Sequence, residues 1–119
     1  MVFDQAGNKL YLTSYIHLVH TRNMEFEWDE AKNRSNIAKH GLGFERAKTI
    51  FDGFCLIRED DREEYGERRD VAIGLLEGVA VIVVVHTERE DRRRLISARP
   101  ANRRERKLYY ETLRKRTDG

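Results

Sequence analysis

Arginine, lysine and histidine residues lie near the ends of the expected helices and strands, and they are the side chains of this sequence with the clearest chemical use. The sequence contains no glycine-rich phosphate loop, no cluster of metal-ligating residues and no nucleophile elbow. Cations in such positions suit cleavage of RNA without a metal ion or cofactor, because the 2′-hydroxyl group of the RNA is itself the nucleophile. The protein then has to stabilise the extra negative charge on the phosphate and to assist the proton transfers.

The candidates for catalytic roles are His40, Arg69, Arg94, Arg99 and Glu105. His40 could transfer a proton, the arginines could make forked contacts to a phosphate, and Glu105 could orient one of the arginines. Each also has a structural interpretation. His40 would lie at the negative end of a helix dipole, the arginines would pair with the acidic segment 59–67, and Glu105 would cap a helix.

The candidates for RNA binding are Lys32, Lys39, Arg103, Arg104 and Tyr109. Lys32, Asn36 and either Lys39 or His40 are three or four residues apart, so they lie along one face of a helix. This polar stripe could face phosphate, but spacing alone favours an ordinary solvated surface. Tyr109 could stack on a base, although an aromatic residue on the apolar stripe of a helix usually belongs to the core.

Charge is distributed unevenly along the 119 residues, although the net charge is only +2. Residues 58–70 include seven acidic and four basic side chains, whereas residues 92–116 include eleven basic and two acidic ones. The basic segment indicates a polyanionic partner, and a solvated charged surface without nucleic acid is an equal alternative. Charged residues make up 37% of the chain, so we expect one domain with a small core.

Cys55 is the single cysteine, which excludes an intrachain disulfide bond. It lies between Phe54 and Leu56, so we expect a small core side chain, with a nucleophile as the weaker alternative. His86 follows an apolar segment and is a further titratable candidate, for which a structural role is the more common one. No segment is apolar over enough residues to cross a bilayer, and the chain does not begin like a secretory signal, so we expect a cytoplasmic protein.

The N-terminal half of the expected domain combines a short strand with two helices. Alternating residues predict a strand over 25–28. A helix over 29–40 follows, with Asp29 as its N-cap and Gly41 at its end. The apolar spacing of the next segment predicts a second short helix over 44–51.

The C-terminal half has the pattern of a sheet followed by a helix. Apolar alternation and continuous apolar segments predict strands over 54–58, 69–76, 79–86 and 93–99. In the last strand, simple alternation places Arg94 and Ala98 on one face and Leu95 and Arg99 on the other. The spacing of Asn102 and Glu105 is that of a capping box and predicts a C-terminal helix. The order of elements therefore predicts an α+β fold, with two N-terminal helices and one C-terminal helix packed on an antiparallel sheet.

Residues 1–23 differ from the rest by their mixture of aromatic residues, histidines and β-formers. We expect them to be an N-terminal extension, upstream of a natural start at Met24, and residues 24–119 to be the domain. The alternative is an additional strand or a short helix on the edge of the domain.

Several of these motifs occur in one collinear order over about residues 24–113 and resemble the BrnT family of toxins. The first helical part carries Trp28-Asp29, Lys32, Asn36, Lys39-His40-Gly41, Phe44 and Ala47. The strands carry Gly66-Glu67, Arg69, Ile73-Gly74, the segment 83–89 and the segment 94–99, and the last helix carries Glu105 and Tyr109.

The resemblance implies a RelE-like fold and a ribonuclease activity that stops translation. It also implies a BrnA-like antitoxin with a ribbon-helix-helix domain, which would silence the toxin. The complex would repress its own operon, so operator DNA would be bound only through the antitoxin. The matched positions that could serve the active site are Lys32, His40, Arg69, Arg94, Arg99 and Glu105. The alternative functions are a nucleic-acid-binding module without catalysis and a protein-interaction module.

Three residues depart from the pattern of the family. Asp70 stands where an aromatic residue is common, Arg93 where isoleucine is common, and Pro100 where a lysine often follows the last strand. Asp70 and Arg93 could pair across strands. Pro100 puts in doubt a phosphate contact at that position.

Overall fold

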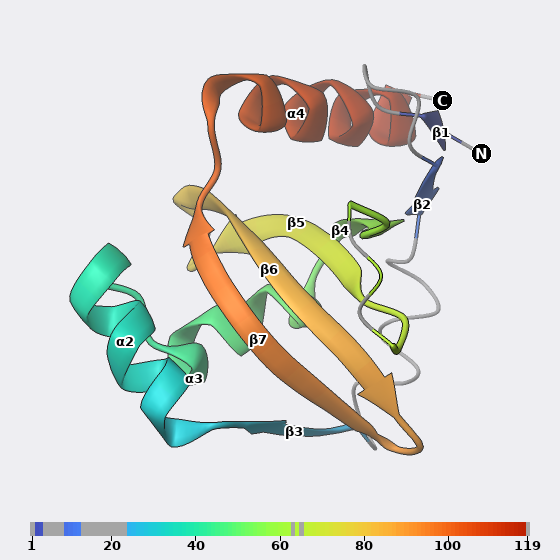
Figure 1. Ribbon diagram of the computed structural model, residues 1–119. Helices are drawn as coiled ribbons and strands as arrows, with labels where there is room; N and C mark the ends of the chain where they lie inside the picture. Colours follow the sequence, from blue (N-terminus) through green and yellow to red (C-terminus); the bar gives the residue numbers. More distant parts are fainter. Residues whose placement is uncertain (1, 4–8, 13–23, 63, 65, 119) are drawn as a thin grey trace.

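The computed structural model describes residues 2–3, 9–12, 24–62, 64 and 66–118, and its elements form a mixed α+β fold (Figure 1). The strands are β1 (Val2–Phe3), β2 (Lys9–Leu12), β3 (Glu25–Trp28), β4 (Cys55–Glu59), β5 (Asp70–Leu76), β6 (Ala80–Arg89) and β7 (Arg92–Pro100). The helices are α2 (Glu30–His40), α3 (Phe44–Ala47), the 3₁₀ helix η1 (Lys48–Asp52) and α4 (Arg103–Asp118). The second helix, expected as one element over 44–51, is therefore a single α-helical turn continued by a 3₁₀ helix.

The described strands form one sheet in the order β1-β2-β4-β5-β6-β7-β3. Neighbouring strands are antiparallel except at one edge, where β3 runs parallel to β7 with Phe26 opposite Arg93 and Glu27 opposite Arg94. The expectation of an antiparallel sheet is therefore wrong for this edge. The reason is topological: the helices and three strands lie between β3 and β7 in the chain, and a parallel neighbour needs such a long connection.

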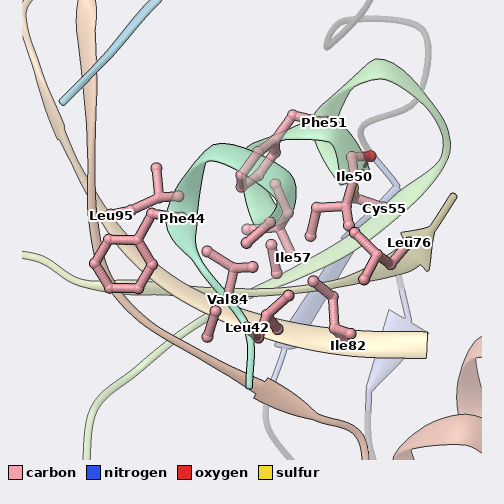
Figure 2. Close-up of a cluster of buried hydrophobic side chains, with 13 residues drawn as sticks. Leu42, Phe44, Ile50, Phe51, Cys55, Ile57, Leu76, Ile82, Val84 and Leu95 are labelled. Carbon is pink, nitrogen blue, oxygen red and sulfur yellow. Dashed lines mark hydrogen bonds between the residues drawn. The ribbon is translucent and has the colours of Figure 1, made fainter. Parts of the chain in front are cut away.

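One surface of the sheet, which we call the α3 face, is covered by α3 and η1. Phe44, Ile50 and Phe51 from these helical turns are almost fully buried. They pack against strand residues that include Cys55, Ile57, Ala72, Leu76, Ile82, Val84, Leu95 and Ala98 (Figure 2). This cluster is the larger of the two cores and holds the N-terminal helical layer on the sheet.

The opposite surface, which we call the α4 face, carries α4. Its buried cluster joins Tyr109 of α4 to Phe54, Leu56, Val71, Ile73, Val81 and Val83. Further along the strands on this face, Arg58 and Val85 are only half-buried. The α4 face therefore has a packed end under the helix and a more exposed end beyond it.

A β-bulge interrupts the pairing of β6 with β7. Val85 lies opposite Ser97, but the next residue of β6, His86, lies opposite Leu95. Ile96 is therefore an extra residue in β7, and side chains before and after it no longer follow one alternation.

The bulge corrects the expected distribution of β7 side chains over the two faces. Leu95 and Ala98 both belong to the core of the α3 face. Arg94 and Arg99, which simple alternation separates, lie together on the α4 face, where Arg94 contacts Glu27 and Arg99 contacts Glu105. A local irregularity thus brings two predicted site residues to the same surface.

Both ends of α2 form as the sequence predicts. The Asp29 carboxylate accepts hydrogen bonds from the backbone N–H groups of Ala31 and Lys32, at 2.8 and 3.1 Å. Gly41 ends the helix with φ of 67°, a left-handed conformation that glycine adopts without steric cost.

Asn36, on the inner side of α2, pairs with the free edge of β7 beyond the end of β3. Its side-chain N–H groups donate to the Ala98 and Leu42 carbonyls, both at 2.7 Å, and its oxygen accepts from the Ala98 N–H at 3.1 Å. The amide side chain therefore takes the place of a neighbouring strand at Ala98. Asn36 belongs to the packing of α2 and not to a phosphate-facing stripe.

The described part of residues 1–23 adds strands to the other edge of the sheet. β2 pairs antiparallel with β4, with Leu10 opposite Arg58, and β1 pairs with β2. The rest of this segment lies outside the described residues, and a natural start at Met24 stays a prediction. No helix in the described ranges has the length and apolar character needed to cross a membrane.

Candidate functional site

Four arginines share the more exposed end of the α4 face. Arg58 follows Leu56 by two residues in β4, and Arg69, directly before β5, precedes Val71 by two residues, so strand alternation places both on this face. The bulge adds Arg94 and Arg99 from β7. We call Arg58, Arg69, Arg94 and Arg99 the arginine cluster. All four residues are partly exposed.

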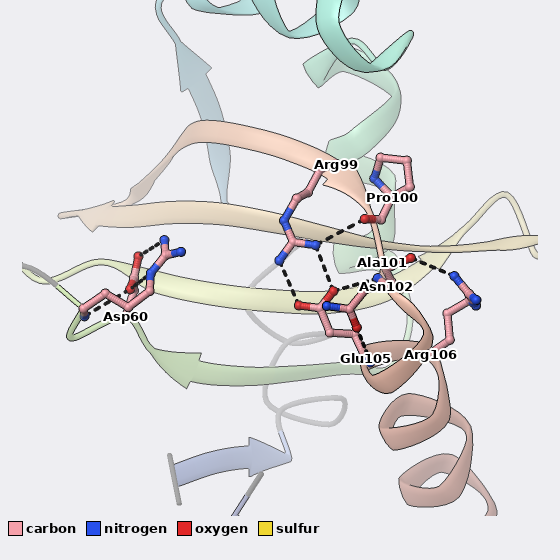
Figure 3. A network of polar contacts seen from close by, with 8 residues as sticks. Asp60, Arg99, Pro100, Ala101, Asn102, Glu105 and Arg106 are labelled. Carbon is pink, nitrogen blue, oxygen red and sulfur yellow. Dashed lines mark hydrogen bonds and ion pairs between the residues drawn. The ribbon is translucent and has the colours of Figure 1, made fainter. Parts of the chain in front are cut away.

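Arg99 has the best-defined geometry in the cluster. Its two terminal nitrogens donate to the two carboxylate oxygens of Glu105, both at 2.8 Å (Figure 3). Glu105 also forms the predicted capping box with Asn102, because each residue's side-chain oxygen accepts from the other's backbone N–H at 2.8 Å. The start of α4 is thereby tied to the end of β7, and Arg99 is held in a fixed orientation above the sheet.

The pair of Glu105 and Arg99 changes the titration of both groups. Burial alone would raise the pKa of Glu105, but the hydrogen bonds from Arg99 and Asn102 lower it below its ordinary value overall. The hydrogen bond to Glu105 raises the pKa of Arg99. Glu105 is therefore an ionised positioning residue at neutral pH, and Arg99 is permanently cationic.

Arg94 lies opposite Thr87 of β6. Arg94 donates to Glu27 of β3 at 3.0 Å. The carbonyl of Arg69 accepts from the backbone N–H of Asp60 at 2.8 Å, so Asp60 extends the pairing of β4 with β5. The sequence alternative, in which the arginines pair with the acidic segment 59–67, does not describe Arg94 and Arg99, whose carboxylate partners are on β3 and α4.

Sequence reasoning missed Arg58 and Arg62 as members of this charged surface. Arg58 lies near enough to Glu105 to help lower the pKa of that carboxylate. Arg62 lies near enough to Arg99 to oppose its positive charge. Alternation along β4 could have placed Arg58 on the same face as Leu56. The position of Arg62 depends on a loop, so no sequence pattern predicted it.

The candidates on α2 do not join this group. Lys32 and Lys39 are exposed, and His40 is half-buried at the end of the helix. Figure 1 shows α2 and α3 on one side of β7 and α4 on the other. Among the described residues, no hydrogen bond or ion pair connects His40 with the arginine cluster. Proton transfer by His40 and RNA binding by the two lysines stay predictions.

Tyr109 is not available for base stacking, which corrects that prediction. The residue is 2% exposed, packs against Phe54 and donates a hydrogen bond from its hydroxyl to the Phe54 carbonyl at 3.1 Å. Tyr109 lies on the apolar stripe of α4, which faces the sheet, so its ring is buried between the helix and the strands. Arg103 and Arg104 are exposed in the first turn of α4, so RNA binding by them stays a prediction.

Cys55 and His86 are buried on the α3 face. Burial raises the pKa of the Cys55 thiol to about 12, and the thiol donates to the Ile50 carbonyl at 3.1 Å. His86 lies edge-on to the Phe51 ring, with Nδ1 3.5 Å from a Glu88 oxygen. Both positions are structural. Within the described ranges, no group of three or more histidine, cysteine or acidic residues is placed to hold a metal ion.

Asp70 and Arg93 are not cross-strand partners, contrary to the expectation. They lie on β5 and β7, and β6 separates these strands. Asp70 lies opposite His86 and accepts from Arg68 at 3.1 Å, whereas Arg93 lies opposite Glu88 and donates to its carboxylate at 2.5 Å. Asp70 and Arg93 therefore each have a charged partner of their own.

Comparisons with known proteins cover the same part of the chain as the site. Residues 28–105 match a family model described as the ribonuclease toxin BrnT of type II toxin–antitoxin systems. The chain is also similar to the 1.1 Å crystal structure of the ribonuclease toxin BrnT from Brucella abortus, with 29% identity and a TM-score of 0.52. That similarity covers 67% of this chain and 99% of the Brucella chain. No curated protein sequence matches the chain. The family match includes the whole arginine cluster and Glu105.

Proposed function

The chain belongs to the BrnT family of ribonuclease toxins of type II toxin–antitoxin systems, and on this premise we propose that it cuts RNA on the α4 face, without a metal ion, and thereby stops translation. The observation that carries the proposal is the arginine cluster around the Arg99–Glu105 pair. Several cations here face one shared surface, and the carboxylate of Glu105 orients one of them. Such a surface suits a phosphate whose negative charge increases during the reaction.

The reaction requires little covalent chemistry from the protein. The 2′-oxygen of the RNA forms a bond to phosphorus, the bond from phosphorus to the 5′-oxygen breaks, and a 2′,3′-cyclic phosphate results. One proton leaves the 2′-hydroxyl and one is delivered to the leaving 5′-oxygen. Arg99, with Arg69 and Arg94, would stabilise the charge on the phosphate in between. Glu105 would act through Arg99, because both of its oxygens already accept hydrogen bonds from this arginine.

The toxin would be neutralised by a partner protein. The family of type II systems implies an antitoxin, and we propose one of the BrnA-like ribbon-helix-helix class. Operator DNA would then be bound only through the antitoxin, and both proteins would act in the cytoplasm. Co-expression with a ribbon-helix-helix protein encoded next to this chain should restore growth and yield a complex that co-purifies. Growth arrest that persists despite co-expression would contradict this choice of partner.

Cleavage can be tested with purified protein in EDTA at neutral pH, under single-turnover conditions. Wild-type protein should produce RNA fragments with 2′,3′-cyclic phosphate ends. Arg69→Ala and Arg99→Ala should lower the rate by about 100- to 1,000-fold each, as for the loss of one well-aimed donor to a developing charge. His40→Ala tests the predicted proton transfer: a loss of about 100-fold or more would support it, and a wild-type rate would remove His40 from the site.

Arg46→Ala is a matched control, because Arg46 is an exposed, ion-paired arginine of α3 on the other side of the sheet. It should cleave RNA at the wild-type rate. Intact RNA with the wild-type protein would overturn the nuclease proposal. Salt-dependent binding without cleavage would instead support the nucleic-acid-binding module.

A further inference from the structure

The loop after β4 contains an arginine that is held by a buried carboxylate. The Asp60 side chain is 1% exposed, whereas the Arg62 side chain is 65% exposed. Nε and a terminal nitrogen of Arg62 donate to the two Asp60 oxygens at 2.8 and 2.9 Å (Figure 3). An exposed ion pair between flexible side chains contributes little. Here the carboxylate is fixed by burial, so the guanidinium group is oriented while most of the arginine stays in solvent.

Strand pairing places this ion pair beside the arginine cluster. The backbone N–H of Asp60 donates to the Arg69 carbonyl, and Asp60 follows Arg58 by two residues, on the α4 face of the sheet. Arg62 is also close enough to Arg99 for the two positive charges to repel, which acts to lower the pKa of Arg99. The Asp60–Arg62 pair and the Arg99–Glu105 pair thus lie on the same face (Figure 3).

Each of the two arginines has one carboxylate beside it, Asp60 for Arg62 and Glu105 for Arg99, and each keeps exposed surface on which a further anion can be bound. In this region Arg62 opposes the positive charge of Arg99, and Arg58 lies near Glu105, whose two oxygens accept hydrogen bonds from Arg99. A polyanion with regularly spaced charges can contact both arginines at once. Single-stranded RNA has this property, because successive nucleotides each present one phosphate.

We propose that Arg62 binds an RNA phosphate next to the one at Arg99, and that Asp60 is the positioning residue that holds Arg62 there. This inference rests on the proposed function, since it assigns a second phosphate contact to the same RNA. It extends the site from the sheet onto the loop between β4 and β5. Arg62 would contribute to binding equally before and during the reaction, so it should affect KM and leave kcat nearly unchanged.

The experiment measures binding of a single-stranded RNA that carries 2′-O-methyl groups, which cannot be cleaved, over a range of salt concentrations. Arg62→Gln should weaken binding by about tenfold and reduce the slope of log affinity against log salt by about 0.7, the value for one phosphate contact on a single strand. Asp60→Asn should also weaken binding and reduce the salt slope, because Arg62 loses the carboxylate that orients it. The double variant should bind no more weakly than Arg62→Gln alone.

Arg34→Gln is the matched control, because Arg34 is an exposed arginine on α2 and its loss changes the net charge equally. It should leave the salt slope at the wild-type value. Kinetics on cleavable RNA provide the second measurement: Arg62→Gln should raise KM by about tenfold with kcat within twofold of wild type. The exposed position of Arg62 means that this variant should fold even if Asp60→Asn does not.

The possible outcomes separate this inference from the proposed function. If the wild type cleaves RNA but Arg62→Gln keeps the wild-type salt slope and KM, the second phosphate contact is overturned and the nuclease stands. If Arg62→Gln shows the loss but folded Asp60→Asn does not, the positioning role of Asp60 is overturned. If the wild type neither binds nor cleaves RNA, both proposals fail together.

Discussion

On the α3 face of the sheet Arg93 is buried, whereas on the α4 face its neighbour in the sequence, Arg94, is half exposed. The guanidinium carbon of Arg93 lies 4.5 Å from the centre of the Phe51 ring, and its Nε donates to Glu88. Arg94 has a carboxylate partner too, but lies at the open end of the α4 face. The same residue type is a part of the core on one side of β7 and a potential ligand contact on the other. The difference depends on what covers each face.

The carboxylates of the two faces show the same contrast. Burial raises the pKa of Asp70 on the α3 face, although Arg68 acts in the opposite direction. On the α4 face, hydrogen bonds from Arg99 and Asn102 outweigh burial and lower the pKa of Glu105. Burial thus favours the neutral form of Asp70, whereas the hydrogen bonds favour the ionised form of Glu105. Substitutions on the α3 face should therefore change mainly stability, and those on the α4 face should change mainly RNA cleavage.

The largest loss of stability should follow Asn36→Ala, which removes the α2 side chain that pairs with the edge of β7. This variant leaves the backbone groups of Ala98 and the Leu42 carbonyl without the partners that the amide provides. We expect the free energy of unfolding to fall by about 4 kcal/mol, since each buried polar group left without a partner costs about 1–3 kcal/mol. Urea denaturation measures this change. Lys32→Ala, on the exposed side of the same helix, should change stability by less than about 0.5 kcal/mol.

Arg93→Met and Arg94→Met test the contrast between the two faces directly. Loss of the buried Arg93 removes its contacts with Glu88 and Phe51, and should lower the free energy of unfolding by about 2 kcal/mol. The more exposed ion pair of Arg94 with Glu27 should contribute less than about 1 kcal/mol.

The order of the two effects should be reversed for RNA cleavage, measured at temperatures where both variants are folded. Arg94→Met should cleave more slowly and Arg93→Met should retain wild-type activity. Equal effects of the two variants on stability would contradict the contrast.

Glu105→Gln should cost about 1.5 kcal/mol at neutral pH, because charge-assisted hydrogen bonds from Arg99 are replaced by weaker ones. The lowered pKa of Glu105 in the folded protein means that its contribution is present above the ordinary value of 4.5 and is lost as the pH falls through the lowered folded value. The difference in stability between wild type and variant should therefore vanish in acid. A difference that stays constant from pH 7 to pH 2 would show that the ionised carboxylate is not the cause.

Asp70→Asn should have an effect of the opposite sign. A raised pKa in the folded state means that ionisation opposes folding as the pH rises above the ordinary value of 3.8. Asparagine removes this penalty, so the variant should be more stable than wild type at pH 7, which urea denaturation measures. The gain should disappear below pH 3.8, where aspartate is protonated in both states. A variant less stable than wild type at pH 7 would mean that the hydrogen bond from Arg68 outweighs burial.

Local sequence signals predicted the elements that local interactions form. Asp29 and Gly41 bound α2, and Asn102 with Glu105 starts α4, because capping depends on residues only a few positions apart. The apolar segment around Val83 became a strand inside the sheet for a similar reason: its two apolar faces require cover on both sides.

The sequence by itself therefore determined the order of the elements, the mixed α+β class and most members of the arginine cluster. Only the tertiary structure decided which face each charged residue occupies. The extra residue Ile96 in β7 brings Arg94 and Arg99 together, and the burial of Asp60 fixes Arg62 beside them. These features depend on pairing and burial between distant segments, whose free energies no short sequence pattern contains.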